Sequence, residues 1–163
     1  MAFAEDLLEQ AGHLAHREPR RPRQASLRRA VSTAYYAVFH LLIREATNNW
    51  RRAEYRNTLG RAFAHGQMKS ASQKKRRDLD VLRITLAPGR ERDVASHLHL
   101  VADTFLALQQ HRHIADYDNS KRWSRRETLE LVEAAAAAFE SWKQIRDEPL
   151  AQEYLVSLLV KER

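Results

Sequence analysis

Apolar residues recur three or four positions apart along most of the chain, which is the spacing of an α-helix. The clearest run is Leu27–Ala46, which contains neither of the helix breakers Gly and Pro. One side of this predicted helix is a core-facing seam of Leu27, Val31, Ala34, Val38, Leu41 and Leu42, with Tyr35 at its edge. The opposite side is a polar and aromatic stripe of Arg29, Thr33, Tyr36, His40 and Arg44. This stripe is either one wall of a basic site or an ordinary solvated face, and its spacing alone favours the solvated face.

The same periodicity predicts helices on both sides of this run. Prolines break the chain at 17–23, 87–89 and 149, and Ser124 followed by Glu127 forms a capping box that starts a helix. We expect helices over residues 2–16, 50–64, 94–110, 124–146 and 150–160, with Asp93 as the N-cap of the third and a turn over 114–123. The strongest apolar stripe among them is Val94, Leu98, Val101, Phe105 and Leu108.

Residues 66–92 interrupt this pattern with basic side chains. Lys69, Lys74, Lys75, Arg76 and Arg77 accompany only one large apolar residue in the first part of the segment, Met68. We therefore expect 66–92 to form an exposed basic excursion and loop. It is either solvated or an electrostatic surface for nucleic acid that lacks interleaved aromatic rings to stack bases. The helical periodicity of the remaining chain predicts an all-α, up-and-down bundle. We expect it to form a single domain, 1–163, with its core in 24–146 and a tail helix at 150–160.

The composition narrows the classes of partner. The chain of 163 residues has 28 Lys and Arg against 21 Asp and Glu, a formal charge of +7, which permits an anionic partner. The absence of Cys excludes disulfides and thiolate metal sites and fits a reducing cytoplasm. The acidic start MAFAEDLLEQ does not resemble a signal peptide, and no apolar run approaches about 18 residues, so we expect a cytoplasmic protein without a membrane span.

Arg112 is the most unusual residue in the pattern, because it continues the apolar stripe that begins at Val94. A charge on a core-facing line must be paired or reach solvent. Arg112 therefore either caps its own helix end or points into a polar pocket together with Asp116, Tyr117 and Asp118, with Tyr36 and His40 as a facing wall. The sequence contains no Gly-rich phosphate loop, HExxH, CxxC or nucleophile elbow, so it predicts no metal site and no cofactor.

Two stretches resemble a known family. Residues 30–40, AVSTAYYAVFH, resemble the AYYAxFH helix of small bacterial and archaeal HEPN-domain proteins, and residues 112–118, RHIADYD, resemble the RxxADYD ending of a later helix in the same proteins. The resemblance extends roughly from Ala25 to Trp142. It implies a helical bundle that is commonly dimeric and has a polar cleft. Many members are ribonucleases held by a nucleotidyltransferase-type antitoxin, and others bind nucleotides or act as scaffolds.

The resemblance also assigns roles to residues. Nuclease members carry an Arg, a polar residue and a more distal His. Arg112 and His113 match the first two positions, whereas Asp116, Tyr117 and Asp118 stand where the distal His belongs. The resemblance thus favours a homodimeric module that binds a nucleotide or RNA without catalysis, with Arg112 on phosphate and Tyr36, His40, Tyr117 and Arg29 around it. One alternative is a diverged, metal-independent endoribonuclease with His40 or His113 as acid or base. The other is a protein-interaction subunit.

Overall fold

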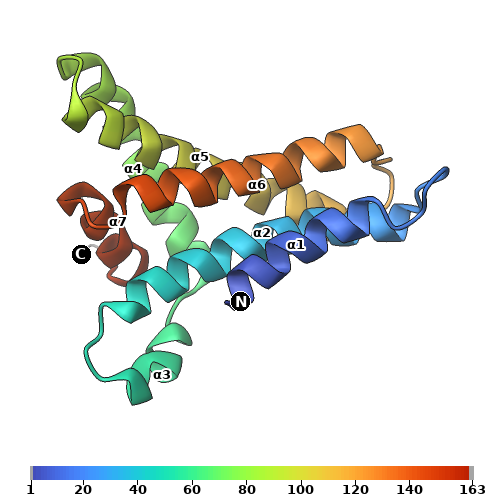
Figure 1. Ribbon diagram of the computed structural model, residues 1–163, viewed down its shortest axis with the longest axis horizontal. Helices are drawn as coiled ribbons and strands as arrows, with labels where there is room; N and C mark the ends of the chain where they lie inside the picture. The colour runs from blue at the N-terminus through green and yellow to red at the C-terminus, as the bar shows by residue number, and fades with distance from the viewer. Residues whose placement is uncertain (1, 162–163) are drawn as a thin grey trace. The chain divides into compact units, whose positions relative to one another are not determined.

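The computed structural model describes residues 2–161, and every regular element in that range is helical (Figure 1). The all-α prediction is therefore confirmed. The elements are α1 Phe3–Ala15, α2 Gln24–Asn48, a 3-10 turn Ala53–Tyr55, α3 Arg56–Gly60, α4 His65–Thr85, α5 Arg90–Tyr117, α6 Arg125–Ile145 and α7 Pro149–Leu159. None of these helices combines the length and the apolar character that crossing a bilayer requires.

The helices are distributed over two compact units. Unit 1 comprises Met1–Leu41 and Ala107–Phe139, and unit 2 comprises Leu42–Leu106 and Glu140–Arg163. The apolar seam predicted for α2 is buried along its length, since Leu27, Val31 and Val38 are fully covered. The stripe of α5 is also buried, as Val94 is 4% exposed and the four residues after it in the stripe are fully covered. Periodicity thus identified the core residues of both long helices.

Unit 1 has a core in which Leu27 and Val31 of α2 meet Ala115 of α5 and Trp123. Two arginines hydrogen-bond to backbone carbonyls of the segments that connect the helices around this core. The Arg28 guanidinium donates to the carbonyl oxygens of Ala115 at 2.8 Å, Asp118 at 2.9 Å and Lys121 at 2.6 Å. The Arg125 guanidinium donates to the carbonyls of Ala15, Glu18 and Pro19. Because Arg presents its donors as a planar fork, one side chain satisfies several carbonyls that a turn leaves unpaired.

Unit 2 is built on the packing of α4 against α7. The Ser72 hydroxyl lies 2.7 Å from the Tyr154 hydroxyl in a buried hydrogen bond. At the end of α2, the Glu45 carboxylate accepts from the Trp142 indole at 2.8 Å and from Arg146 Nη2 at 2.7 Å. A carboxylate with two strong donors keeps its charge satisfied although its side chain is only 10% exposed.

The prediction of a basic excursion and loop at 66–92 is wrong for most of its length. Residues 65–85 form α4, which buries Met68, Ser72, Lys75 and Leu79. These four positions are spaced four, three and four apart, so they lie on one helix face. The small Ser72 and the aliphatic stem of Lys75 complete a face that the count of large apolar residues did not detect. The break at 87–89 is confirmed, and Gly89 adopts a φ of +153° there, which favours glycine.

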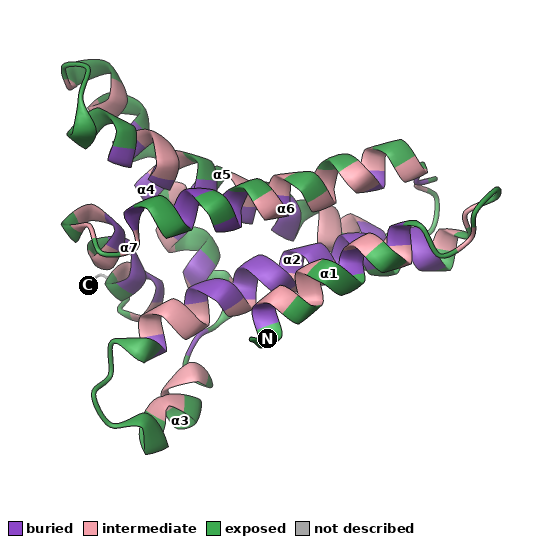
Figure 2. Ribbon diagram, in the orientation of Figure 1, coloured by how far each residue is buried: buried purple, intermediate pink, exposed green. Residues whose placement is uncertain are grey.

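The other differences concern helix ends. α5 starts at Arg90 and continues to Tyr117, so Asp93 lies in its first turn instead of at its N-cap, and 114–117 are helical instead of turn. The helix expected over 50–64 is reduced to the 3-10 turn and α3, both of which are exposed or half-buried (Figure 2). The tail helix is confirmed, with Pro149 in its first turn. The cap at Ser124 is also confirmed, because its hydroxyl accepts from the Glu127 amide at 3.1 Å.

Candidate functional sites

Arg112 lies in unit 1 against two tyrosine rings of α2. Its guanidinium carbon is 5.1 Å from the centroid of the Tyr35 ring and 5.9 Å from that of Tyr36. Both distances are within the range of a cation–π contact. The Arg112 side chain is 15% exposed. The arginine that interrupts the apolar stripe is therefore accommodated by aromatic faces on the neighbouring helix.

The hydrogen bonding of Arg112 is incomplete. Its Nη1 lies 3.7 Å from an Asp116 oxygen one turn along α5, which is an ion pair but longer than a hydrogen bond. Its Nε is buried and has no hydrogen-bond partner among residues 2–161. The predicted pairing of Arg112 with an aspartate is confirmed for Asp116. Asp118 instead accepts from the hydroxyl and amide of Ser120, and these bonds hold the pKa of its carboxyl below the ordinary value.

Arg112, Tyr35, Tyr36 and Asp116 form what we call the Arg112 cluster. Tyr35 is the member of this cluster that the sequence did not assign to a site. Burial raises the pKa of its phenol well above the ordinary value, while the nearby Arg112 charge and a hydrogen bond with Gln109 act in the opposite direction. Its position at the edge of the apolar seam marked it as core, and it is fully covered. Nothing in the local pattern distinguishes a core tyrosine from one that supports an arginine, so only the packing of α2 against α5 reveals this role.

The remaining predicted residues lie around the Arg112 cluster. The His40 ring is 6.3 Å from that of Tyr36 and packs edge-on against Phe3 at 4.9 Å. The exposed His113 ring packs at 5.0 Å against the ring of Tyr117, which lies one turn further along α5. Arg29 is exposed near the start of α2. The structure therefore brings together Arg112, Tyr36 and Asp116.

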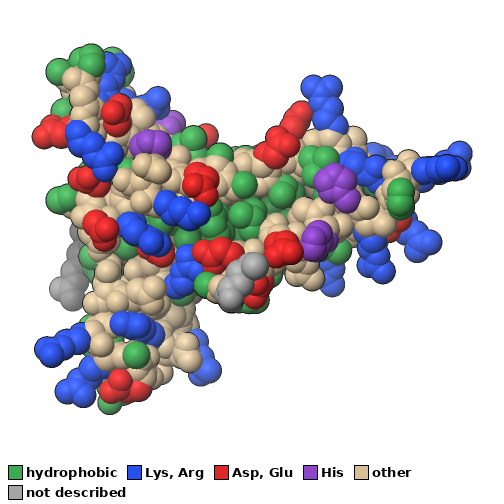
Figure 3. Space-filling model, in the orientation of Figure 1, with side chains coloured by type: hydrophobic (Ala, Val, Ile, Leu, Met, Phe, Trp, Pro, Cys, Tyr) green, Lys and Arg blue, Asp and Glu red, His purple; other side chains and the backbone are tan. Residues whose placement is uncertain are grey.

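A second candidate lies in unit 2, in residues 50–61, which we call the aromatic–arginine loop. Trp50 and Tyr55 are 52% and 54% exposed, whereas the other two tryptophans, Trp123 and Trp142, are 3% and 0% exposed. The loop carries Arg51, Arg52, Arg56 and Arg61 and one acidic residue, Glu54, a net charge of +3. Figure 3 shows Lys and Arg side chains gathered over this segment, around α3.

Backbone contacts hold the aromatic–arginine loop in one shape. Arg56 donates from Nε to the Trp50 carbonyl at 3.0 Å and from Nη2 to the Asn48 carbonyl at 3.3 Å. The Trp50 amide donates to the Thr47 carbonyl at 2.9 Å. Gly60 passes close to α2, since a Cβ there would lie 3.4 Å from the Ile43 side chain. The exposed rings are thus carried on an ordered segment, which lowers the entropic cost of binding a ligand.

This loop is not among the sites predicted from the sequence. Helical periodicity places Trp50 at the start of a helix over 50–64, and the test for interleaved aromatic rings was applied only to the basic segment 66–92. The available signal was the alternation of arginine with aromatic residues in WRRAEYR, residues 50–56, which is typical of surfaces that stack nucleic-acid bases. Comparison of the whole chain with protein-family models, curated proteins and solved structures gives no match.

Proposed function

We propose that this protein binds single-stranded RNA and that the aromatic–arginine loop is its contact surface. The observation that carries the proposal is the exposure of Trp50 and Tyr55 among four arginines. A large aromatic ring in water is unfavourable unless a partner covers it, and a base covers it by stacking, which contributes roughly 1–3 kcal/mol per base. Stacking tolerates any base, so the expected binding has little sequence preference.

The arginines supply the contacts to the RNA backbone. Arg56 is engaged with two backbone carbonyls, whereas Arg51, Arg52 and Arg61 are exposed, and Arg52 forms a long ion pair with the exposed Glu54 at 3.8 Å. If each of these three neutralises one phosphate, the slope of log affinity against log salt is about −2 on a single strand. Affinity that depends steeply on salt is therefore part of the proposal, and a flat salt response with retained affinity contradicts it.

Arg112 is a second, weaker candidate within the same function. The resemblance to HEPN-domain proteins makes it the phosphate ligand, and its buried, unpartnered Nε is the feature that favours this role. The proposal is for binding without catalysis, because the distal His of the nuclease pattern is replaced by Asp116, Tyr117 and Asp118. A homodimer, and a nucleotidyltransferase-type antitoxin as partner, remain predictions of the resemblance alone.

Tryptophan fluorescence tests the proposal directly. Trp50 is the exposed tryptophan, so stacking of bases on it should quench emission while the buried Trp123 and Trp142 contribute a constant background. We expect a single-stranded oligouridine to quench saturably, and Trp50→Phe, which keeps a ring, to bind with similar affinity but without the quench. Trp50→Ala should weaken binding by about 1–3 kcal/mol in a fluorescence anisotropy assay with labelled RNA. Arg126→Ala, which removes a side chain that is 90% exposed in unit 1, is the matched control.

The ribonuclease alternative is tested in the same samples. Labelled RNA incubated with the protein and EDTA should remain intact in gels. Cleavage that disappears in Arg112→Ala would replace the proposal with a catalytic one. If wild-type protein fails to bind RNA at low salt, the proposed function is wrong for both candidate sites.

A further inference from the structure

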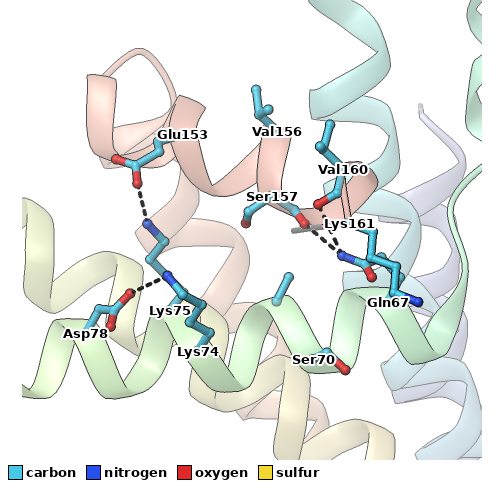
Figure 4. A pocket seen from close by; sticks show the side chains of 11 residues that line it. Gln67, Ser70, Lys74, Lys75, Asp78, Glu153, Val156, Ser157, Val160 and Lys161 are labelled. Atoms are coloured by element: carbon cyan, nitrogen blue, oxygen red, sulfur yellow. Dashed lines mark hydrogen bonds and ion pairs between the residues drawn. The ribbon is translucent and has the colours of Figure 1, made fainter. Parts of the chain in front are cut away.

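A groove of about 570 Å³ runs between α4 and α7 in unit 2 (Figure 4). We call it the α4–α7 groove. Its size lies within the range of small-molecule sites. Lys74 and Lys75 line it from α4, and Val156 of α7 and Val160, just after the end of α7, line the other side. None of its lining residues belongs to the Arg112 cluster or to the aromatic–arginine loop, so its chemistry is separate from the proposed function.

Lys75 is the central feature of the groove. Its side chain is only 9% exposed, yet it ends in an ammonium group with three donors. The ammonium donates to an oxygen of Glu153 at 3.1 Å, and that carboxylate belongs to a side chain that is 69% exposed. The partners therefore differ: Lys75 requires an acceptor because it is desolvated, whereas Glu153 regains water when it is released.

The other groups define the shape of a ligand. The Lys74 ammonium donates to Asp78 at 3.3 Å, and Lys74 directly precedes Lys75 along the α4 side of the groove lining (Figure 4). Val156 of α7 and Val160, which directly follows the last residue of that helix, are 62% and 55% exposed and give the groove an apolar wall. At the far end, the Gln67 amide donates to the carbonyls of Ser157 and Val160 at 3.3 and 3.4 Å. A cationic end formed by Lys74 and Lys75 is thus joined to an apolar strip, and Lys161 lines the groove beside Gln67 (Figure 4).

We propose that the α4–α7 groove binds a small organic anion, with a carboxylate or phosphate head on Lys75 and Lys74 and an apolar body along Val156 and Val160. The head takes the place of the Glu153 carboxylate, so the charge of Lys75 stays paired throughout the exchange. The apolar body covers the two valines. Both parts are needed, because a head alone competes poorly with Glu153 and an apolar body alone leaves the ammonium groups unused.

The test uses four probes against the full chain labelled with ¹⁵N for NMR. Hexanoate and hexyl phosphate combine a head with a body, acetate supplies the head alone, and hexanol supplies the body alone. We expect saturable amide shifts on α4 and α7 with hexanoate, hexyl phosphate or both. Acetate and hexanol should each bind at least about tenfold more weakly. The stronger of the first two identifies the head group. Absence of saturable shifts with both, or equal binding of hexanol, overturns the inference.

Two variants locate the binding. Val156→Asp places a negative charge on the exposed apolar wall and should weaken hexanoate or hexyl phosphate by about tenfold or more without unfolding the chain. Val81→Asp is the matched control, because Val81 is 61% exposed on α4 and lies outside the groove lining. Lys75→Met keeps the length of the stem and should abolish the shifts. If Lys75→Met does not fold, the Val156→Asp variant provides the test. If Val156→Asp binds the organic anion with the same affinity as the Val81→Asp control, the inference is overturned.

RNA binding is measured on the same samples. The groove variants should bind RNA like the wild type, and Trp50→Ala should bind the organic anion like the wild type. Failure of one proposal therefore leaves the other standing.

Discussion

The Arg112 cluster and the aromatic–arginine loop contain the same pair of side-chain types in opposite environments. In the cluster, Arg112 is 15% exposed and lies over Tyr35, which is fully covered. In the loop, the rings of Trp50 and Tyr55 are about half exposed, and the side chain of Arg52 is 73% exposed. Both regions combine arginine with aromatic residues in the sequence, and they differ in how far these side chains are buried.

The difference indicates what each region does. A cation–π contact is stronger when water is excluded, so the covered contact of Arg112 stabilises the fold of unit 1. The same groups in water contribute little to folding but remain available to a partner. An arginine next to a tyrosine is thus not in itself a sign of a binding site. The family resemblance implies a binding role for Arg112, and exposure makes Trp50 and Tyr55 the aromatic residues of this comparison that a ligand can reach.

Alkaline pH should produce the largest effect, because it ionises the covered phenol of Tyr35 beside Arg112. Burial raises the phenol pKa of Tyr35, and likewise that of Tyr154 in unit 2, above the ordinary value of 10. A raised pKa in the folded state means that the stabilisation is complete below about pH 10 and is lost as the pH rises. Each phenol should lower the free energy of unfolding by up to about 1.4 kcal/mol per pH unit above pH 10. Urea titrations at several pH values should show a shallower loss for Tyr35→Phe than for the wild type.

Removal of Arg112 should be the next largest change. Arg112→Ala loses contact with two rings and leaves Asp116, whose side chain is 31% exposed, to water. We expect a loss of about 2–3 kcal/mol in the free energy of unfolding, measured by urea denaturation. Arg126→Ala should change it by less than about 0.5 kcal/mol. If Arg112→Ala keeps its stability but loses RNA binding, the comparison fails and Arg112 is a ligand residue.

Truncation of Tyr55 should affect binding without affecting the fold. Tyr55→Ala should weaken the affinity for oligouridine by about 1–2 kcal/mol, because one stacked base is lost. Its urea midpoint should stay within error of the wild type, since Tyr55 is 54% exposed. A drop in stability with unchanged RNA affinity would make the loop a structural element like the Arg112 cluster.

The charges of the loop should produce the smallest effect, visible in the salt dependence. Replacing both Arg51 and Arg52 by Ala should make the slope of log affinity against log salt less steep by about 1.4, or about 0.7 for each phosphate contact. Anisotropy titrations at four or five salt concentrations measure this slope. An unchanged slope would assign the phosphate contacts to other basic residues.

Much of the fold follows from periodicity. The seam from Leu27 and the stripe from Val94 are local patterns, and a helix with an apolar side must bury it. The stripe also placed Arg112 on the core-facing side of its helix, and in the structure its side chain is 15% exposed. α4 was not predicted as a packed helix because Ser72 and Lys75 are polar residue types. They become part of a buried face only when α7 packs against them. Burial of this kind depends on a partner helix that is distant in the sequence.

The candidate sites were predictable to a smaller extent. The pairing of Arg112 with Asp116 follows from their i, i+4 spacing. The support from Tyr35 does not, since it depends on the register of α2 against α5. The three carbonyls bound by Arg28 are separated from it by about 90 residues in the chain. Every residue has a backbone carbonyl, so the residue types at these positions do not indicate that Arg28 binds them.

The Arg28 contacts have a consequence for proteolysis. The connection between α5 and α6 exposes Arg122 and partly exposes Lys121, which are both trypsin sites by type. A protease requires the chain to leave its folded path and enter the enzyme in extended form. Arg28 holds the carbonyls of Asp118 and Lys121 in this connection, so cleavage there should be slow although the basic side chains reach solvent. In Arg28→Gln, which cannot span three acceptors, limited digestion should begin at this connection and separate α6 and α7 from the rest of the chain.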